Sequence, residues 1–411
     1  MLAGGDRVAV SREEAAALDA ADPLAGFRER FVFTDEERIY LDGNSLGRLP
    51  VATHDRLRAL VDEWGDRLVS GWPDWIDAPA RVGDALAESV LGAEPGEVIV
   101  ADSTTVNLFK LCAAALDLQP GPLVTDRANF PTDRYVLEGL ARQRGLELRI
   151  VDRVQDALEG AAVVVLSHVD YRTGELADLA GVTALARSHG ARVVWDLSHS
   201  AGAVPIGLSA AGVELAVGCT YKYLNAGPGA PAFLYVAREL QPRLRSPIQG
   251  WFGQRDQFDM DRAYDPVEGV GRFMAGTPPI LDLAAVESGV RLTAEAGVGA
   301  LRDKSVGLCE LLVELNHAWL VPLGFALGSP RDPERRGSHI SLRHPDAWRI
   351  CQAMIARAAV IPDYRGPDSI RLGVAPLYTR FVDVWDAVDR IAGIVERGEQ
   401  KRMAAARARV T

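Results

Sequence analysis

The feature that most constrains the fold is a regular alternation of short apolar runs and helical stretches through the middle of the chain. The β-rich runs occur at 97–101, 123–125, 148–151, 162–167, 192–196, 215–219 and 233–236. Helical patterns separate most of these runs, at 105–116, 133–144 and 178–189. Strands that alternate with helices are typical of a mainly parallel sheet covered on both faces. We therefore predict an α/β fold built on a mainly parallel seven-stranded sheet.

The two ends of the chain have a different character. The N-terminal end shows a polar helical pattern, a short strand and a turn, at 11–30, 39–42 and 43–47. After about residue 285, two helical stretches flank two strand candidates, the former at 283–318 and 345–359 and the latter at 338–343 and 369–374. This pattern indicates a smaller α+β domain. We predict an N-terminal arm that packs near the small domain, a large domain and a small C-terminal domain, at 1–50, 51–285 and 286–411.

Charge and cysteine usage exclude several function classes. The net charge is -11 and the one basic cluster is Lys401 to Arg409, which we expect to be a solvated helix end rather than a nucleic-acid-binding arm. Four widely spaced cysteines form no CxxC pair, so we expect neither a metal site nor a disulfide framework. No apolar run approaches the ~20 residues of a membrane span, and the acidic N-terminus is unlike a signal peptide. We expect a cytoplasmic protein with no membrane or nucleic-acid partner.

Polar residues that follow the strands are the candidates for chemistry, because ligands of such sheets bind at the carboxyl ends of the strands. Thr104 and Thr105 follow the first run where a helix begins, a position suited to phosphate but equally to a helix cap, which this feature alone favours. Phe130 and Asp133 follow the second run. An aromatic residue ahead of a proline can stack on a flat ring, although by itself it is more often part of a core.

Three further strand ends carry polar groups. Ser167 ends the run at 162–167, and Asp196, with His199 three residues on, ends the run at 192–196. Alone, that aspartate is as typical of a helix cap as of a carboxylate that holds a buried cation. Lys222 lies between two tyrosines after the run at 215–219 and before a Gly-Pro-Gly turn. Most lysines are solvated, but a lysine made less basic by desolvation is suited to Schiff-base chemistry.

The combination of these residues is more specific than any one of them. Pyridoxal phosphate needs a lysine for the imine, a carboxylate for the pyridine nitrogen, an aromatic ring for stacking and hydroxyl groups for the phosphate. Lys222, Asp196, Phe130 and the Thr104-Thr105 pair supply these parts at successive strand ends. We therefore predict a pyridoxal-phosphate site on this edge of the sheet.

Several stretches resemble those of fold-type I pyridoxal-phosphate enzymes, in the branch of class V aminotransferases and cysteine desulfurases. They are most similar to the kynureninase family, and the match runs along most of the chain. The stretches are Tyr-Leu-Asp-Gly-Asn-Ser-Leu-Gly (40–47), Asn-Phe-Pro-Thr-Asp (129–133), Asp-Leu-Ser-His-Ser-Ala-Gly (196–202), Tyr-Lys-Tyr-Leu-Asn-Ala-Gly (221–227), Gly-Trp-Phe-Gly (250–253), Gly-Thr-Pro-Pro-Ile (276–280) and Ile-Arg-Leu-Gly-Val-Ala-Pro-Leu-Tyr (370–378).

The resemblance implies a role for each residue near the cofactor. Lys222 would bind the cofactor covalently and then move the Cα proton of the substrate. Asp196 would pair with the pyridine nitrogen beside His199, and Tyr221 would act as an acid. Other residues would stack on the ring, contact the cofactor nearby or hold its phosphate and ring substituents, namely Phe130, Asp133, Thr104, Thr105, Ser167 and also Tyr221.

The resemblance also implies a homodimer with shared active sites and a set of substrate-binding residues. Trp251 and Thr277 would reach the cofactor of the partner subunit. Arg371 would bind the substrate α-carboxylate, a task that suits its planar fork, and Ser45 would line the substrate side. Trp64 and Thr277 stand where some animal members carry His and Asn, so these two residues are typical of bacterial members, which generally favour kynurenine over its 3-hydroxy derivative.

The implied reaction is the hydrolysis of L-kynurenine to anthranilate and L-alanine in tryptophan catabolism. Two alternatives are weighed, one from the same branch and one from a different class. A cysteine desulfurase or aminotransferase belongs to the same branch, but a desulfurase needs a reactive cysteine on a flexible loop, and Cys351 lies in a predicted helix. A non-catalytic cofactor-binding regulator would carry a fused DNA-binding module, whereas about 40 residues precede the first motif of this acidic chain.

Overall fold

The structure is a computed structural model that describes residues 10–404 of the 411-residue chain. Residues 405–409 of the basic cluster lie outside the described residues. The described chain forms two compact units. The larger unit comprises Ala52–Tyr171 and Ala177–Gly297, and the smaller one comprises the described parts of Met1–Val51, Arg172–Leu176 and Val298–Thr411.

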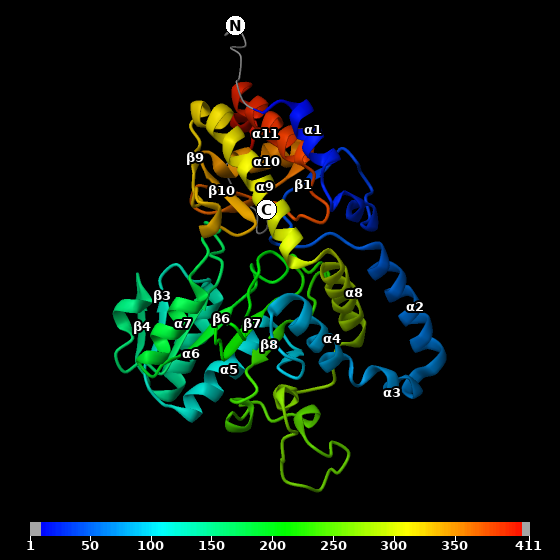
Figure 1. The fold of residues 1–411 in the computed structure, drawn as a ribbon, viewed down its shortest axis with the longest axis vertical. Coiled ribbons are helices and arrows are strands. Elements are labelled where there is room, and N and C mark those ends of the chain that lie inside the picture. The colour runs from blue at the N-terminus through cyan, green and yellow to red at the C-terminus, as the bar shows by residue number, and fades with distance from the viewer. Residues whose placement is uncertain (1–9, 405–411) are drawn as a thin grey trace. The chain divides into compact units, whose positions relative to one another are not determined.

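A seven-stranded sheet forms the centre of the larger unit, which confirms the predicted fold class (Figure 1). The strand β8 (Phe233–Val236) runs antiparallel to both of its neighbours, and every other pairing in the sheet is parallel. In spatial order the strands are β2 (Val98–Val100), β8 (Phe233–Val236), β7 (Leu215–Gly218), β6 (Arg192–Asp196), β5 (Val163–Ser167), β3 (Leu123–Asp126) and β4 (Leu148–Val151).

Helices cover both faces of this sheet, as the alternation of side chains along β6 shows. Val194 packs into a core with Leu108 and Leu137, which lie on α5 (Thr104–Leu118) and α6 (Pro131–Arg144). The next residue, Trp195, points to the opposite face, where its indole N–H donates to Thr183 of α7 (Leu179–Ser188) at 2.9 Å. The sheet is therefore buried on both sides, which explains its apolar strands without alternation.

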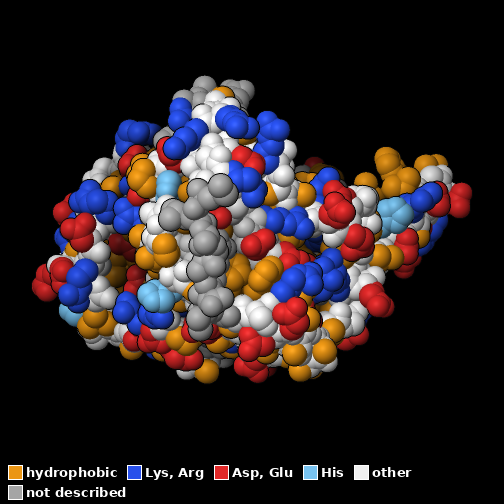
Figure 2. Space-filling view, turned by 90° about the horizontal axis from the view of Figure 1, so that it is seen from above, with side chains coloured by type: hydrophobic (Ala, Val, Ile, Leu, Met, Phe, Trp, Pro, Cys, Tyr) orange, Lys and Arg blue, Asp and Glu red, His pale blue; other side chains and the backbone are white. Residues whose placement is uncertain are grey.

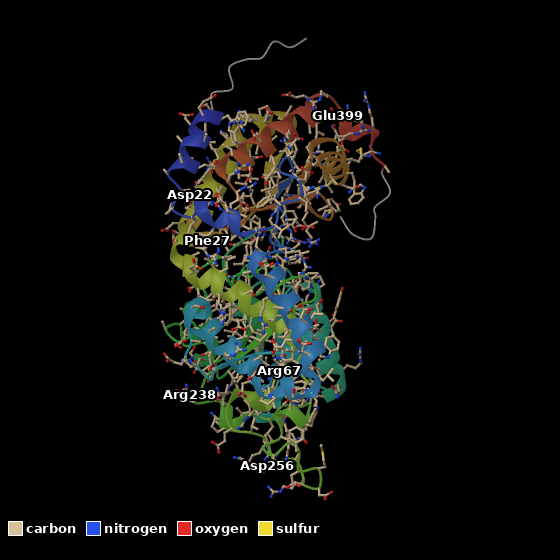
Figure 3. All side chains as sticks on the ribbon, turned by 90° about the vertical axis from the view of Figure 1, so that its right-hand side faces the viewer. Asp22, Phe27, Arg67, Arg238, Asp256 and Glu399 are labelled. Carbon is tan, nitrogen blue, oxygen red and sulfur yellow. The ribbon has the colours of Figure 1, made fainter. Side chains whose placement is uncertain are left out.

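The remaining helices of the larger unit lie beyond the β2 edge. α4 (Ala78–Leu86) packs on β2 and on α8 (Ile280–Ala296), and α2 (Val51–Arg67) precedes the one-turn helix α3 (Trp72–Trp75). Between residues 251 and 273 the chain forms two 3₁₀ turns, Trp251–Gly253 and Val270–Phe273, joined by a long loop. Asp256 lies near the tip of this loop, at the end of the larger unit (Figure 3).

A four-stranded antiparallel sheet, a two-stranded parallel sheet and four α-helices form the described part of the smaller unit. Its core includes Leu312, Ile340 and Leu372, which are all buried. Asp19 lies in the last turn of the N-terminal helix α1 (Arg12–Ala20). Its carboxylate accepts the Phe381 and Val382 backbone N–H groups at 2.6 and 3.0 Å and so caps the start of the last α-helix. The elements are β12 (Asp363–Arg365), β13 (Ser369–Gly373), β10 (His339–Arg343), β9 (Ala326–Leu327), the paired strands β1 (Ile39–Tyr40) and β11 (Val360–Ile361), and the helices α9 (Val298–Leu315), α10 (Ala347–Ala358) and α11 (Phe381–Glu396).

The structure differs from the predicted elements in several places, including the following three. The helical stretch expected at 283–318 is two helices, α8 and α9, because Gly297 has φ +77° and ends the first. The polar helix expected at 11–30 stops at Ala20, before Pro23, and only a 3₁₀ turn follows at Ala25–Arg30. The long C-terminal helix α11 is absent from the predicted set, although its apolar residues repeat at helical spacing.

One helical run, Val298–Leu323, has the length and apolar composition of a membrane span. Such a run was not expected from the sequence. Half of its most apolar window is buried inside the structure, and Leu308, Leu312 and Leu315 are fully buried in the core of the smaller unit. Core helices have the same composition, so the run is explained by packing.

Candidate active site

A cavity of about 220 Å³ lies in the larger unit and collects the residues that follow its strands. The register of β5 and β6 pairs Ser167 with Asp196, so two strand ends meet at its floor. Nine predicted residues line it, namely Thr104, Thr105, Phe130, Asp133, Ser167, Asp196, His199, Tyr221 and Lys222. Four residues outside the predicted set also line it, namely Thr132, Val169, Tyr171 and Ser198.

The turn that leads into α5 is arranged so that its threonines are not needed as helix caps. Ser103 is the N-cap and accepts the Val106 backbone N–H at 3.3 Å. Thr104 and Thr105 are therefore the first two residues of the helix, and their side chains line the cavity. Hydroxyl groups and first-turn N–H groups together are suited to a phosphate. The sequence left open whether this turn is a helix cap or a phosphate site. In the structure Ser103 is the cap, and the two threonines after it are available for a phosphate.

Asn129 organises the aromatic side of the cavity, a role the sequence analysis did not assign to it. It is 3% exposed, and its side-chain oxygen accepts the Ser167 hydroxyl at 2.7 Å and the Phe130 N–H at 2.8 Å. Its amide group donates to the Thr125 hydroxyl at 3.1 Å. Phe130 lies edge-on to Tyr171, with 5.1 Å between ring centroids, and remains 38% exposed. One face of Phe130 is therefore available to stack on a flat ligand.

Two buried aspartates give the cavity its acidic side. Asp196 accepts the Ser198 backbone N–H at 2.8 Å, which fixes its carboxylate at the end of β6. Asp133 is 2% exposed, and burial, followed by the charge of Asp196, raises its pKa well above the ordinary value. Its Oδ2 atom has no hydrogen-bond partner within residues 10–404. A buried acceptor or acid without a partner favours a bound group that completes its hydrogen bonding.

Lys222 is the one lysine of the four in the sequence that lines this cavity, the others being Lys110, Lys304 and Lys401. Its amine lies 2.9 Å from His199 Nε2. The loop that follows is closely packed, since a Cβ atom on Gly289 of α8 would stand 1.8 Å from the Leu224 carbonyl oxygen. Next to the lysine, the neighbouring Cys219 and then burial raise the pKa of Tyr221, so its hydroxyl stays protonated.

These residues fit pyridoxal phosphate. The cavity offers a lysine amine, a carboxylate, a partly open aromatic face and a threonine pair at a helix start. The unpartnered Oδ2 atom of Asp133 also needs a polar ligand. A lysine, a carboxylate, an aromatic ring and hydroxyl groups are the set that this cofactor requires.

Three predicted residues of the larger unit do not line the cavity. Trp64 on α2 is 55% exposed, Trp251 is 41% exposed, and Thr277 is also exposed. The segments that carry Trp251 and Thr277 pack backbone to backbone. A Cβ atom on Gly250 would stand 1.9 Å from the Ala275 carbonyl oxygen, so only glycine fits there. The two exposed residues are thus presented together from one structured surface.

The last two predicted residues lie together in the smaller unit. Arg371 is 1% exposed, donates to the Asp363 carboxylate through Nε and Nη2, and donates to the Ser45 hydroxyl at 3.1 Å. Asp42 lies in the same cluster, where burial and then the charge of Asp363 raise its pKa to about 6. The Asp363 carboxylate and the Ser45 hydroxyl therefore fix the orientation of the buried Arg371 guanidinium.

Comparisons with known proteins identify the relatives of this chain. A family model described as the kynureninase C-terminal domain matches residues 301–391, and one described as aminotransferase class V matches residues 86–319. A kynureninase from Pseudomonas fluorescens is 44% identical over 402 residues, which cover 94% of this chain and 96% of the relative. A kynureninase from Burkholderia pseudomallei (strain 1106a) is 45% identical over 401 residues, with the same coverage.

Solved structures share the fold. A cysteine desulfurase from Thermococcus onnurineus NA1 in its apo form superposes with a TM-score of 0.76 at 18% identity, covering 92% of this chain and 98% of that one. A mutant of the protein C-DES with glycine covalently linked to its pyridoxal-phosphate cofactor gives a TM-score of 0.78 at 19% identity, covering 89% and 98%. At these identities the likeness shows the fold alone.

The comparisons confirm three predictions, namely the fold class, the pyridoxal-phosphate cofactor and the resemblance stated from the motifs. The two relatives match the chain over nearly its whole length and well above 30% identity, and the C-terminal model is specific to one branch. The chain belongs to the kynureninase family.

Proposed function

We propose that the chain hydrolyses L-kynurenine to anthranilate and L-alanine, with pyridoxal phosphate bound through Lys222. The observation that carries the proposal is the cavity in which Lys222 meets Asp196, Phe130 and the Thr104-Thr105 pair, in a chain 44% identical to a kynureninase over 402 residues. When bound, the cofactor supplies an electron sink that stabilises negative charge at the substrate Cα.

The residues around the cofactor hold it and move protons. Thr104 and Thr105 hold the phosphate, and Phe130 stacks on the ring. Asp196 keeps the ring nitrogen protonated, which makes the ring a better acceptor of electrons. Lys222, 2.9 Å from His199, would hold the cofactor and would take the proton from the substrate Cα.

The substrate side supplies a carboxylate clamp and an acid. Arg371 binds the α-carboxylate, held by Asp363 and Ser45. One water adds to the γ-carbonyl carbon, the Cβ–Cγ bond breaks, and a proton goes to Cβ. The γ-carbonyl carbon becomes the carboxylate of anthranilate, and Cβ becomes the methyl group of alanine. We assign the Tyr221 hydroxyl as an acid in these steps, because it stays protonated at neutral pH and lines the cavity.

The assay that tests the reaction incubates the purified protein, loaded with cofactor, with L-kynurenine and follows anthranilate fluorescence. We expect anthranilate and alanine to appear in equal amounts. A yellow, cofactor-loaded protein that forms no anthranilate would reject the reaction and leave the cofactor assignment intact.

The four cysteines argue against a desulfurase. All of them are buried, with relative exposures of 0–2%, and burial raises the pKa of each thiol. A cysteine that accepts sulfur must be exposed and readily ionised. The four are Cys112, Cys219, Cys309 and Cys351.

We also propose a cytoplasmic homodimer in which Trp251 and Thr277 complete the site of the partner subunit. Trp251 is 41% exposed, and four more apolar residues of α2 and the turn after it are 49–79% exposed, namely Val61, Trp64, Leu68 and Val69. Apolar side chains gather at the tip of the right-hand projection in Figure 2, where Figure 1 shows α2 and α3. Exposed apolar patches mark interaction surfaces.

Trp64 and Thr277 further support a preference for kynurenine over 3-hydroxykynurenine. We propose that both residues lie near the aromatic ring of the substrate, where neither supplies the His or Asn that some animal members carry. Measuring kcat/KM for the two substrates tests this proposal. A higher value for the hydroxylated substrate would overturn it.

A further inference from the structure

Lys110 is a fully buried cation that the proposed reaction does not use. It lies in the second turn of α5, and its side chain is 0% exposed. Its amine donates to the Asp102 carboxylate and, at 2.6 Å, to the Phe273 carbonyl oxygen. Placing an ammonium group in a core is costly unless its hydrogen bonds are satisfied, so both partners matter to its position.

The first partner, Asp102, begins the phosphate turn, which we define as residues 102–105. Asp102 has φ +52°, a left-handed conformation that a residue with a side chain seldom adopts. Its carbonyl oxygen accepts the Ala232 N–H at 2.8 Å, so its backbone is fixed to the strand beside it. The bond from Lys110 holds the side chain of this strained residue and thereby fixes the point from which Thr104 and Thr105 enter the cavity.

The second partner, Phe273, begins the Thr277 segment, which we define as residues 273–277. Phe273 is 0% exposed, so its carbonyl oxygen has a defined place in the core. The same segment carries the backbone that packs against Gly250 and Gly253, where Cβ atoms would stand 1.9 Å from the Ala275 oxygen and 2.7 Å from the Met274 oxygen. The position of Phe273 therefore also supports the segment of Trp251.

We propose that Lys110 is a positioning residue that ties the phosphate turn to the Thr277 segment. The inference rests on the proposed function, because it takes Thr104 and Thr105 as the phosphate ligands and Thr277 as a residue given to the partner subunit. According to this proposal, the buried ammonium group of Lys110 has two effects. It fixes the geometry of the phosphate site in its own subunit, and it fixes the surface that completes the site of the partner subunit.

The variant Lys110→Met tests the first half by cofactor binding rather than by turnover. The apo form is titrated with pyridoxal phosphate and, separately, with pyridoxal, and the absorbance of the lysine-bound cofactor is followed. We expect the dissociation constant for pyridoxal phosphate to rise about 10- to 100-fold, the range for lost charge-assisted hydrogen bonds. Pyridoxal lacks the phosphate, so its dissociation constant should change less than about threefold.

A matched control separates positioning from general loss of a buried lysine. Lys304 of α9, in the smaller unit, is 5% exposed at its side chain and pairs with Asp22 at 2.7 Å. Lys304→Met should lower the melting temperature and leave the ratio of the two dissociation constants unchanged. If Lys110→Met does not fold, Asp102→Asn, at a side chain 31% exposed, removes the charge that holds the same pair together and should shift the same ratio.

The ratio of the dissociation constants for pyridoxal phosphate and pyridoxal decides whether Lys110 positions the phosphate turn. A folded Lys110→Met or Asp102→Asn protein with the wild-type ratio would overturn the inference. Wild-type protein that binds pyridoxal phosphate but cleaves no kynurenine would reject the proposed reaction without affecting this result.

Mixed dimers test the second half. One subunit carries Lys222→Ala, so each mixed dimer keeps a single site that can bind the cofactor covalently. Lys110→Met is then placed either on the subunit that retains Lys222 or on the other one. We expect weaker cofactor binding in both arrangements. Wild-type affinity in the second arrangement would show that Lys110 acts only within its own subunit and would overturn the link between sites.

Discussion

At the scale of single residues, Lys222 differs from the other lysines in its environment. The chain has four lysines, and three of them have other environments: Lys110 and Lys304 are buried in ion pairs, and Lys401 is exposed near the C-terminal end of the described chain. Lys222 alone lines the cavity and lies beside His199. Proximity to an imidazole and partial burial are the conditions that favour a nucleophilic amine.

We predict that Lys222→Ala abolishes the absorbance of the lysine-bound cofactor and lowers kcat by about 10²–10⁴-fold, the contribution of a positioned general base. Absorption spectra of the purified variant, with and without added pyridoxal phosphate, provide the measurement. Lys304→Met, the matched control, should keep the band. If the band persists in Lys222→Ala, another lysine carries the cofactor.

Asp133 gives a prediction about pH. Burial and the charge of Asp196 raise its pKa, so the folded protein retains a proton that the unfolded chain releases above about pH 4. The unfolded state then binds fewer protons than the folded state, and the stability that this group contributes is lost as pH rises toward its folded pKa. We expect Asp133→Asn, which mimics the protonated acid, to remove that loss.

The measurement is urea unfolding of the cofactor-free protein between pH 5 and pH 8. The free energy of unfolding of wild type should fall relative to that of Asp133→Asn as pH rises. Parallel curves for the two proteins would show that Asp133 does not hold a proton in the folded state.

The predicted residues that line the cavity share one property, which is that each lies at the end of a strand of the main sheet or in the segment that follows it. Thr104, Ser167 and Asp196 could be found because the carboxyl ends of parallel strands share one edge. Asn129 could not be given its role in this way, since its bonds to Ser167 and Thr125 depend on the order of the strands in the sheet. That order, with β3 beside β5, is set by the tertiary fold, and no local sequence pattern predicts it.

At the scale of elements, close packing between a helix and a loop decides whether a glycine-to-alanine substitution raises or lowers the stability. Glycine in a helix interior is normally less stable than alanine by about 0.5–1 kcal/mol. Gly289 of α8 is an exception, because a Cβ atom would overlap the Leu224 carbonyl oxygen at 1.8 Å. That oxygen belongs to the loop just after Lys222, so the overlap would displace the lysine as well as the helix.

We predict that Gly289→Ala lowers the free energy of unfolding by about 1–3 kcal/mol, the usual cost of overpacking, and weakens cofactor binding. Gly139, within α6, is the control, because a Cβ atom there would meet nothing within 4 Å. Gly139→Ala should raise stability by about 0.5–1 kcal/mol. Urea denaturation of both variants gives the comparison, and equal stability of the two would refute the packing argument.

The elements themselves could be predicted from the sequence where the pattern is strongest. All seven strands of the main sheet were predicted near their observed bounds, and the runs are most apolar in the inner strands, such as β5 and β7. The division of 283–318 into α8 and α9 was not predicted, because Gly297 acts through a backbone angle and the residues on either side have helical composition. The two-residue strands β9 and β11 are too short to show any periodicity.

At the scale of the whole molecule, the exposed apolar residues need an explanation that a single chain does not provide. Val69 in the turn after α2 is 79% exposed, and Phe258 and Met260 on the long loop of the larger unit are 74% and 73% exposed. An isolated apolar side chain on a surface is ordinary, but a group of them on one helix and turn is typical of an interface. The proposed homodimer accounts for this group and for the exposure of Trp251.

We predict that Val69→Glu converts a dimer into a monomer, because burying an unpaired carboxylate at an interface costs several kcal/mol. Light scattering coupled to size-exclusion chromatography gives the mass. The monomer should also bind pyridoxal phosphate less tightly, since Trp251 and Thr277 would no longer reach the partner's cofactor. Tyr135 of α6, which is 63% exposed, provides the control: Tyr135→Glu should leave both mass and affinity unchanged. A dimeric Val69→Glu protein would place the interface elsewhere, and a monomer with full cofactor affinity would show that each site is complete within one subunit.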